Sequence, residues 1–141
     1  MKTEDLMIGD WLYLGKTDIA VRVIALSAEE DDTILVKYQE PDRWGKYVEL
    51  VGGEDVAPVP LTPEILKKNG FGYTEIDPYS NVTHYYPGEP QYCADMDLHI
   101  GGIYKGIFWL NTYKNVISNI RFVHELQHAF RICKINKEIE L

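Results

Sequence analysis

The sequence predicts an α+β fold in which a small SH3-like antiparallel β-barrel is followed by a helix–antiparallel sheet–helix unit. Three observations lead to this prediction. The first 60 residues break into short β-type runs, residues 62–69 carry the start and stop signals of a short helix, and residues 115–133 show helical apolar spacing. We therefore expect one domain over residues 1–61 and another over 62–141, and the same pattern also fits one compact domain.

The barrel prediction rests on five short runs of β-branched, aromatic and aliphatic residues with turn signals between them. Glycines at positions 15, 45, 52 and 53 mark three of these turns, because glycine adopts the backbone conformations that tight turns need. The predicted strands are residues 7–14, 19–26, 33–38, 47–51 and 56–61.

The first helix has clear boundary signals. Thr62 is a good N-cap, because its hydroxyl can accept an otherwise unpaired backbone N–H, and Pro63 fits the first helical position. Asn69 and Gly70 supply a left-handed stop, after which Phe71 can fold back on the helix. The helix should therefore span about two turns.

The residue pattern from position 71 to the C-terminus predicts a β-meander and a second helix. Residues 71–76, 83–86, 92–100 and 103–110 read as antiparallel strands. Apolar residues at helical spacing predict a helix over residues 115–133, and residues 138–141 read as a last edge strand.

The HELQH motif in this second helix is the first candidate for chemistry. His124 and His128 lie one helical turn apart, so both could bind one zinc ion while Glu125 acts as general base on a bound water. A catalytic zinc needs a third protein ligand, and the glycine and third histidine of the extended motif are absent, because Arg131 and Lys134 stand there. At about 100° per residue, both histidines lie opposite the apolar stripe. We therefore interpret them as surface residues and assign no catalytic residue, metal or cofactor.

A second polar cluster lies on a predicted strand. In extended backbone, alternate side chains share one face, which places Asp95, Asp97 and His99 together. We interpret this face as the solvated side of a half-buried strand. In the alternative, a zinc-dependent hydrolase, one of these three residues would supply the third ligand to His124 and His128.

Aromatic residues are concentrated in residues 71–113, which hold ten of the seventeen in the chain. Tyrosine and tryptophan suit interfaces because their rings are large and stiff and carry a polar group. Most of these rings should fill the core. For a binding surface we select Tyr85, Tyr86, Tyr92 and Trp109.

The charge and hydropathy of the chain argue against several classes of function and location. The net charge is −8, which repels phosphate and argues against nonspecific nucleic-acid binding, even though Arg121 and Arg131 suggest a basic helix face. No apolar run approaches the length of a membrane span, and residues 1–11 do not resemble a secretory signal. The two cysteines fit a reducing compartment, so we expect a cytoplasmic protein.

Three segments, IGDWLYL, PVPLTPEILKKNGF and VHELQHAFRICKINKEIEL, resemble a set of small proteins from Bacteroidales gut bacteria and their phages. The resemblance covers nearly the whole chain, and LTPEILxxNGF is its most specific part. It implies little about mechanism, because that family is uncharacterised. It also counts against an essential metal site at HELQH, since the C-terminal helix of the family often lacks one or both histidines.

These observations together favour a noncatalytic binding or accessory protein of phage or mobile-element origin, with a protein as its partner. The zinc-dependent hydrolase described above is the alternative.

Overall fold

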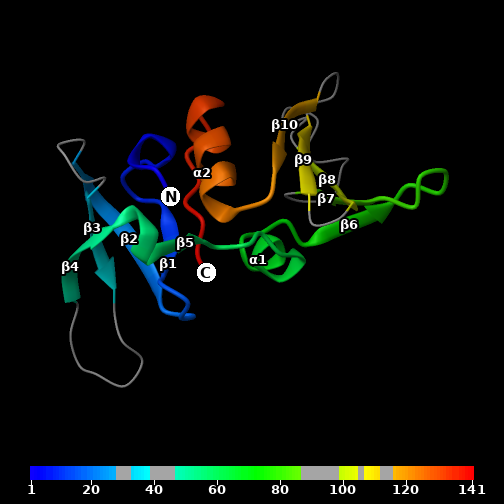
Figure 1. Ribbon diagram of the computed structural model, residues 1–141. Helices are drawn as coiled ribbons and strands as arrows, with labels where there is room; N and C mark the ends of the chain where they lie inside the picture. Colours follow the sequence, from blue (N-terminus) through cyan, green and yellow to red (C-terminus); the bar gives the residue numbers. More distant parts are fainter. Residues whose placement is uncertain (28–32, 39–46, 87–98, 105–106, 112–115) are drawn as a thin grey trace. The chain divides into compact units, whose positions relative to one another are not determined.

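The computed structural model describes residues 1–27, 33–38, 47–86, 99–104, 107–111 and 116–141 (Figure 1). These residues form two antiparallel sheets and two α-helices, which confirms the predicted α+β class. The chain divides into two compact units, which we call the first and the second unit. The first unit contains Met1–Val59 and Phe122–Ile132, and the second contains Pro60–Arg121 and Cys133–Leu141.

The first sheet has the strand order β4-β3-β2-β1-β5, formed by β1 (Trp11–Leu14), β2 (Ala20–Leu26), β3 (Thr33–Tyr38), β4 (Tyr47–Gly52) and β5 (Val56–Pro58). Four strands form a meander, and the fifth returns to pair antiparallel with β1. Two short 3-10 helices, Thr3–Asp5 and Gly53–Asp55, precede β1 and β5. Strands β4 and β5 stand at the two ends of the order, and no pairing among the described residues closes it into a barrel.

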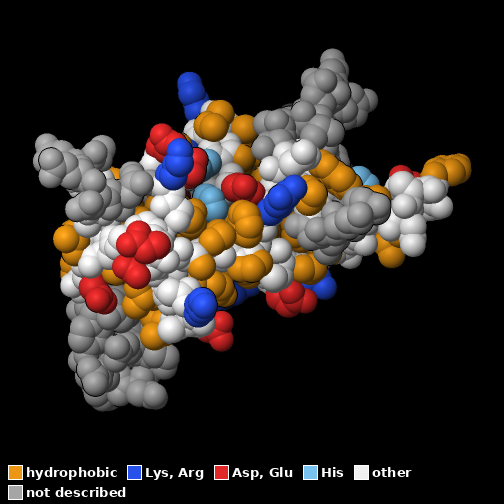
Figure 2. Space-filling model, in the orientation of Figure 1, with side chains coloured by type: hydrophobic (Ala, Val, Ile, Leu, Met, Phe, Trp, Pro, Cys, Tyr) orange, Lys and Arg blue, Asp and Glu red, His pale blue; other side chains and the backbone are white. Residues whose placement is uncertain are grey.

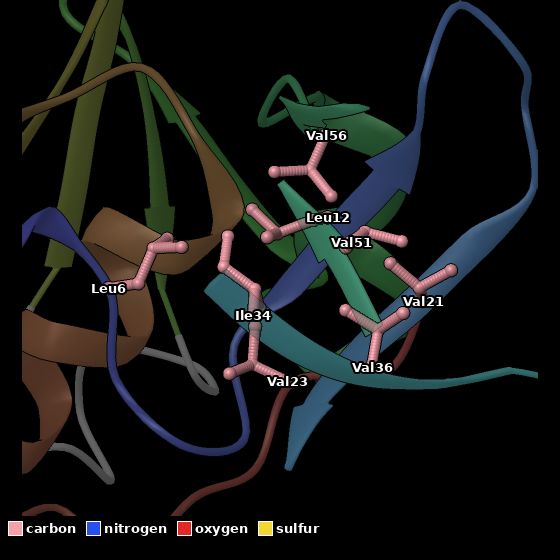
Figure 3. Packing of buried hydrophobic residues seen from close by; sticks show 8 residues of the cluster. All are labelled: Leu6, Leu12, Val21, Val23, Ile34, Val36, Val51 and Val56. Atoms are coloured by element: carbon pink, nitrogen blue, oxygen red, sulfur yellow. The ribbon is translucent and has the colours of Figure 1, made fainter. Parts of the chain in front are cut away.

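The core of the first unit comes from alternating positions on these strands (Figure 3). Val21 and Val23 on β2, and Ile34 and Val36 on β3, are fully buried, because successive strand side chains point to opposite faces. Full burial of each contributes roughly 1.5–3 kcal/mol. The cluster consists of Leu6, Leu12, Val21, Val23, Ile34, Val36, Val51 and Val56.

Helix α1 (Pro63–Lys68) forms as its boundary signals predict. The Thr62 hydroxyl accepts a hydrogen bond from the Ile65 backbone N–H at 3.3 Å. Gly70 takes the left-handed conformation with φ of 84°, and Phe71 turns back so that its N–H donates to the Leu66 carbonyl at 2.9 Å. Phe71 is buried, so the predicted stop is confirmed in full.

The second sheet is an antiparallel meander, as predicted, but it has one strand more than expected and a different break. Residues 101 and 102, predicted as the gap between strands 92–100 and 103–110, lie within the strand His99–Tyr104, and residues 92–98 lie outside the described residues. Its order is β10-β9-β8-β7-β6, formed by β6 (Tyr73–Ile76), β7 (Thr83–Tyr86), β8 (His99–Tyr104), β9 (Ile107–Asn111) and β10 (Val116–Ile120). Its buried side chains include Tyr85, Ile100, Phe108, Leu110 and Ile120.

The predicted helix over residues 115–133 is wrong in its first third. Residues 116–120 form β10, which pairs antiparallel with β9, and the helix α2 covers only Val123–Ile132. Ile120 lies opposite Phe108 in this pairing and is buried, so sheet formation wins over the helical spacing. The helix belongs to the first unit, and β10 belongs to the second.

The C-terminal residues 138–141 form no strand, contrary to expectation. They are held by Asn69 instead. The Asn69 amide donates to the Glu140 carbonyl at 2.7 Å and accepts from the Glu140 backbone N–H at 2.8 Å, and Ile139 is buried. Side-chain pairing therefore fixes this segment without a ladder of backbone bonds.

None of the helices in the described part of the chain has the length and apolar character needed to span a membrane.

Candidate functional site

Helix α2 begins with a cap supplied by the glutamate of the HELQH motif. The Glu125 carboxylate accepts a hydrogen bond from the Phe122 backbone N–H at 3.2 Å. Glutamate in the first turn of a helix also interacts favourably with the positive end of the helix dipole. Glu125 therefore has a structural role that explains its presence without a reaction.

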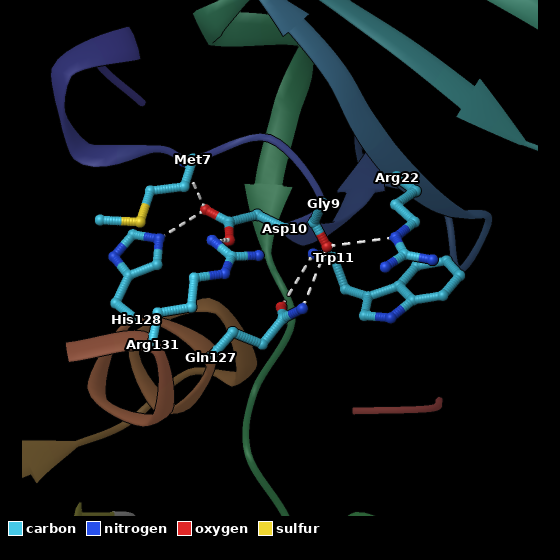
Figure 4. A network of polar contacts seen from close by, with 8 residues as sticks. All are labelled: Met7, Gly9, Asp10, Trp11, Arg22, Gln127, His128 and Arg131. Atoms are coloured by element: carbon cyan, nitrogen blue, oxygen red, sulfur yellow. Dashed lines mark hydrogen bonds and ion pairs between the residues drawn. The ribbon is translucent and has the colours of Figure 1, made fainter. Parts of the chain in front are cut away.

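A fully buried carboxylate, Asp10, connects the segment before β1 to α2 (Figure 4). Its Oδ2 lies 2.7 Å from His128 Nε2 and accepts from the Met7 backbone N–H at 2.7 Å. Its Oδ1 accepts from Arg131 Nη1 at 3.1 Å. A buried charge is expensive unless it is paired and hydrogen-bonded, and Asp10 meets both conditions.

Gln127 makes a second connection between the same two segments. Its amide nitrogen donates to the Gly9 carbonyl at 3.0 Å, and its amide oxygen accepts from the Trp11 backbone N–H at 3.2 Å (Figure 4). Gly9 has a φ of 92°, and a Cβ there would lie 3.0 Å from Arg131 Nη2. Glycine is therefore favoured at this position by its backbone conformation, and a Cβ would also require the Arg131 side chain to shift.

The prediction that both histidines of HELQH are surface residues is wrong. His124 is only 6% exposed, and the His128 side chain is 19% exposed. The reason is that the face opposite the apolar stripe of α2 also packs, through Asp10 and Gln127, onto the segment before β1. Sequence periodicity identified one buried face of this helix and missed the second, polar one.

His124 stacks on Phe122 and has a buried atom without a partner. The two rings are nearly parallel, at 8°, with centroids 5.8 Å apart. Nδ1 of His124 is buried and has no hydrogen-bond partner among the described residues. Burial lowers the pKa of His124, which the carboxylates of Asp10 and Glu125 partly offset, so the neutral imidazole is favoured.

These residues border a cleft of about 610 Å³ in the first unit. Three carboxylate side chains line it, from Glu4, Asp5 and Glu125, together with the imidazoles of His124 and His128. Its apolar lining includes Leu6, Met7, Pro58 and Phe122. Figure 2 shows acidic and histidine side chains next to one another over this part of the molecule.

The zinc alternative gains no third ligand from the described residues. Among them, no group of three or more His, Cys, Asp or Glu side chains is placed to hold a metal ion. Asp95 and Asp97 lie outside the described residues, as does the His99 side chain, although its backbone begins β8. In addition, His128 Nε2 already pairs with Asp10, and the Arg131 guanidinium beside it opposes a cation.

The basic helix face predicted from the sequence does not form as expected. Arg121 follows β10 in the second unit and is not part of α2. Arg131 is on α2, but its guanidinium is bound to Asp10. The two arginines therefore share no helix face that could follow a phosphate backbone.

The four aromatic residues selected for binding have different surroundings. Tyr85 is buried and packs edge-on against Phe108, with ring centroids 6.2 Å apart, so it fills the core. Tyr86 is half-buried and packs edge-on against Tyr73 at 6.0 Å. Trp109 is half-buried on β9, and Tyr92 lies outside the described residues.

The hairpin of β6 and β7 exposes a different group of large apolar residues, which we call the hairpin surface: Tyr73, Ile76 and Tyr79. Tyr79 is 98% exposed, Ile76 61% and Tyr73 39%. All four residues of β6 are exposed, and among the described residues β6 stands at one end of the strand order of its sheet (Figure 1). Figure 2 shows hydrophobic atoms at the end of this hairpin.

The turn that carries Tyr79 is ordered by its own hydrogen bonds. Asp77 accepts from the Tyr79 backbone N–H at 2.9 Å and from the Ser80 hydroxyl at 2.5 Å. These bonds hold the pKa of Asp77 below its ordinary value. Asn81 closes the turn in a left-handed conformation with φ of 56°. Tyr79 is thus presented on a defined turn.

Sequence reasoning missed Asp10, and it included Tyr79 in the aromatic-rich region without selecting it for the binding surface. A signal for Asp10 was available, because an aspartate between Gly9 and Trp11 interrupts an otherwise apolar segment.

Comparison with protein-family models, with curated proteins and with solved structures finds no match for this chain.

Proposed function

We propose that this chain is a noncatalytic binding protein that recognises a protein partner through the hairpin surface. The observation that supports the proposal is the exposure of Tyr79, Ile76 and Tyr73 on an edge strand and its turn. Large apolar side chains grouped on an ordered, exposed element are typical of protein interaction sites.

The chemistry of the hairpin indicates the kind of partner. An edge strand has unpaired backbone N–H and C=O groups, which an extended segment of a partner can satisfy by adding a strand. Tyr79 and Ile76 would then enter apolar pockets. Glu75 and Asp77 accompany them, so a partner with basic residues around those pockets fits best.

The strand order of the first unit supports a proposal about its fold. A four-strand meander whose fifth strand returns to β1 after a 3-10 turn is the order expected of an SH3-like barrel, and we propose that fold for Met1–Val59. Small barrels of this kind carry many unrelated functions, so the fold alone assigns none. The cytoplasm and a phage or mobile element remain the proposed location and origin.

The experiment is site-specific photo-crosslinking from position 79 in lysate of the native host, followed by affinity measurement with the captured partner. Tyr79→Ser and Ile76→Thr should each weaken binding at least about tenfold. The first removes the aromatic ring from the interface, and the second replaces an ethyl group there with a hydroxyl. Val48→Thr is the matched control, since Val48 is 57% exposed on β4, which stands at one end of the strand order of the first sheet. Equal affinity of all three variants and the unaltered protein would contradict the proposal.

The zinc-dependent hydrolase is not adopted, because His128 Nε2 pairs with Asp10, Glu125 caps α2, and the described residues supply no third ligand. It has a direct test. Protein purified without a metal-binding tag should contain no stoichiometric zinc, and His124→Ala should not change its metal content. One zinc per chain that is lost in this variant would favour the hydrolase over the proposal.

A further inference from the structure

The cleft of the first unit is independent of the hairpin surface, and its lining is mainly acidic: Met1, whose ammonium group donates to the Gly53 carbonyl, is the one described lining residue with a fixed positive charge. The side chains of Glu4, Asp5 and Glu125 give its lining three carboxylates, and no Lys or Arg side chain lines it. Lys2 pairs with Glu4 at 3.1 Å, but both side chains are 71% exposed, so water and salt screen this contact. A concave lining with an excess of negative charge concentrates cationic ligands.

The cleft also has an aromatic wall. Phe122 and the His124 ring stack nearly parallel, and both line the cleft. The face of an aromatic ring attracts cations, and guanidinium groups stack on such faces. Leu6, Met7 and Pro58 add apolar lining, against which an alkyl chain can pack.

His124 supplies an observation that the carboxylates do not. Its imidazole is more than nine-tenths buried, lines the cleft, and has no hydrogen-bond partner for Nδ1 among the described residues. A buried polar atom without a partner costs about 1–3 kcal/mol. A polar group of a ligand that reached Nδ1 would offset that cost.

We propose that the cleft binds an alkyl-linked cation, the guanidinium or ammonium group of an arginine or lysine side chain in a peptide. The cation lies between the carboxylates of Asp5 and Glu125 and the aromatic wall of Phe122 and His124. The alkyl chain lies on the apolar lining. A compact metal cation would use neither the aromatic wall nor the apolar lining, and no set of three donors for it is found among the described residues.

The experiment titrates the full chain, followed by NMR of backbone amides, with four probes at low salt. The probes are a blocked Gly-Arg-Gly peptide, the same peptide with norleucine in place of arginine, agmatine, and zinc chloride. We expect the arginine peptide to shift the amides of the first turn of α2, and the norleucine peptide to leave them unchanged. Binding should weaken about tenfold or more at high salt, because the contact is electrostatic. Agmatine carries the same guanidinium group on a small molecule without a peptide backbone. A lower affinity for agmatine than for the arginine peptide supports a peptide ligand, and a higher affinity for agmatine overturns that part of the proposal.

The variant that tests the site is Glu4→Gln with Asp5→Asn, which removes two of the three carboxylates at exposed positions and so should fold. Its affinity for the arginine peptide should fall at least about fivefold. Asp18→Asn is the matched control, since Asp18 is an exposed carboxylate of the same unit outside the cleft. The proposal is overturned if the norleucine peptide binds equally well, if the double variant binds like the control, or if zinc alone shifts these amides. None of these readouts involves the hairpin surface.

Discussion

Asp10 and Tyr79 are each in the environment that their chemistry disfavours. Asp10 is a carboxylate with no exposed surface, in the first unit, and Tyr79 is an aromatic residue that is 98% exposed, in the second. The buried carboxylate has all of its partners within the protein, namely Met7, His128 and Arg131. The backbone of Tyr79 is held by a hydrogen bond of its turn, and its side chain is almost completely exposed.

The comparison separates two reasons for an unusual environment. A buried charge that is completely paired contributes to the folded state and specifies how α2 packs. An exposed apolar group on an ordered turn contributes little to folding, so its presence points to a contact outside the chain. The same distinction predicts that a substitution at Asp10 lowers the free energy of unfolding strongly and that a substitution at Tyr79 hardly changes it.

The largest expected difference lies within one hairpin, between Tyr85 and Tyr79. Tyr85→Ala should destabilise the protein by about 3–5 kcal/mol, because it leaves a cavity against Phe108. Tyr79→Ala should change the free energy of unfolding by less than about 0.5 kcal/mol. Urea unfolding followed by circular dichroism measures both. A large loss of stability in the Tyr79 variant would mean that its ring packs within the chain.

Asp10→Ala should have the next largest effect, a loss of about 2–4 kcal/mol. The variant leaves the Met7 backbone N–H without its acceptor and separates His128 and Arg131 from their shared partner. The value lies below that for a fully buried pair, because the Arg131 side chain is 37% exposed and can be hydrated. Asp18→Asn, at an exposed carboxylate, is the control and should be nearly neutral. An Asp10 variant as stable as this control would show that the network does not hold α2.

The sequence predicted the parts of the fold that local signals determine. Thr62 and Gly70 define α1 by cap chemistry, and period-two alternation at Val21 and Val23 identifies a buried strand face. Residues 116–120 were assigned to a helix because their apolar spacing fits both periods, and only pairing with β9 decides between them. Local pattern carries no information about that pairing.

The candidate sites were less predictable for the same reason. The HELQH spacing correctly placed two imidazoles on one helical face, with ring centroids 5.7 Å apart. It could not show that Asp10, 118 residues away from His128 in the chain, would meet that face. The exposure of Tyr79 was also hidden, because its surroundings depend on how far the β6 and β7 hairpin is covered by the rest of the sheet.

A smaller effect, about 1 kcal/mol, is expected at the boundaries of α1. Thr62→Ala removes the acceptor for the Ile65 N–H, and Gly70→Ala forces a side chain into a left-handed conformation with φ of 84°. Each should lower the free energy of unfolding by a similar amount. Lys67→Ala, on the exposed face of the same helix, is the control. Unequal losses of several kcal/mol would show that α1 depends on contacts other than its caps.

The last prediction concerns the pH dependence of stability, and it separates His124 from the ion pair of Asp10. Burial holds the pKa of His124 below its ordinary value of 6.5, so the unfolded chain binds this proton more readily than the folded one. The free energy of unfolding should therefore rise with pH between the lowered pKa and about 6.5, and the stabilisation is complete above that value. In His124→Phe, which keeps a ring beside Phe122, this contribution should disappear, and the stability of the variant relative to the unaltered protein should improve as the pH falls below 6.5. Unfolding curves at a series of pH values measure the difference, and parallel pH profiles of the two proteins would show that the buried imidazole does not titrate differently in the folded state.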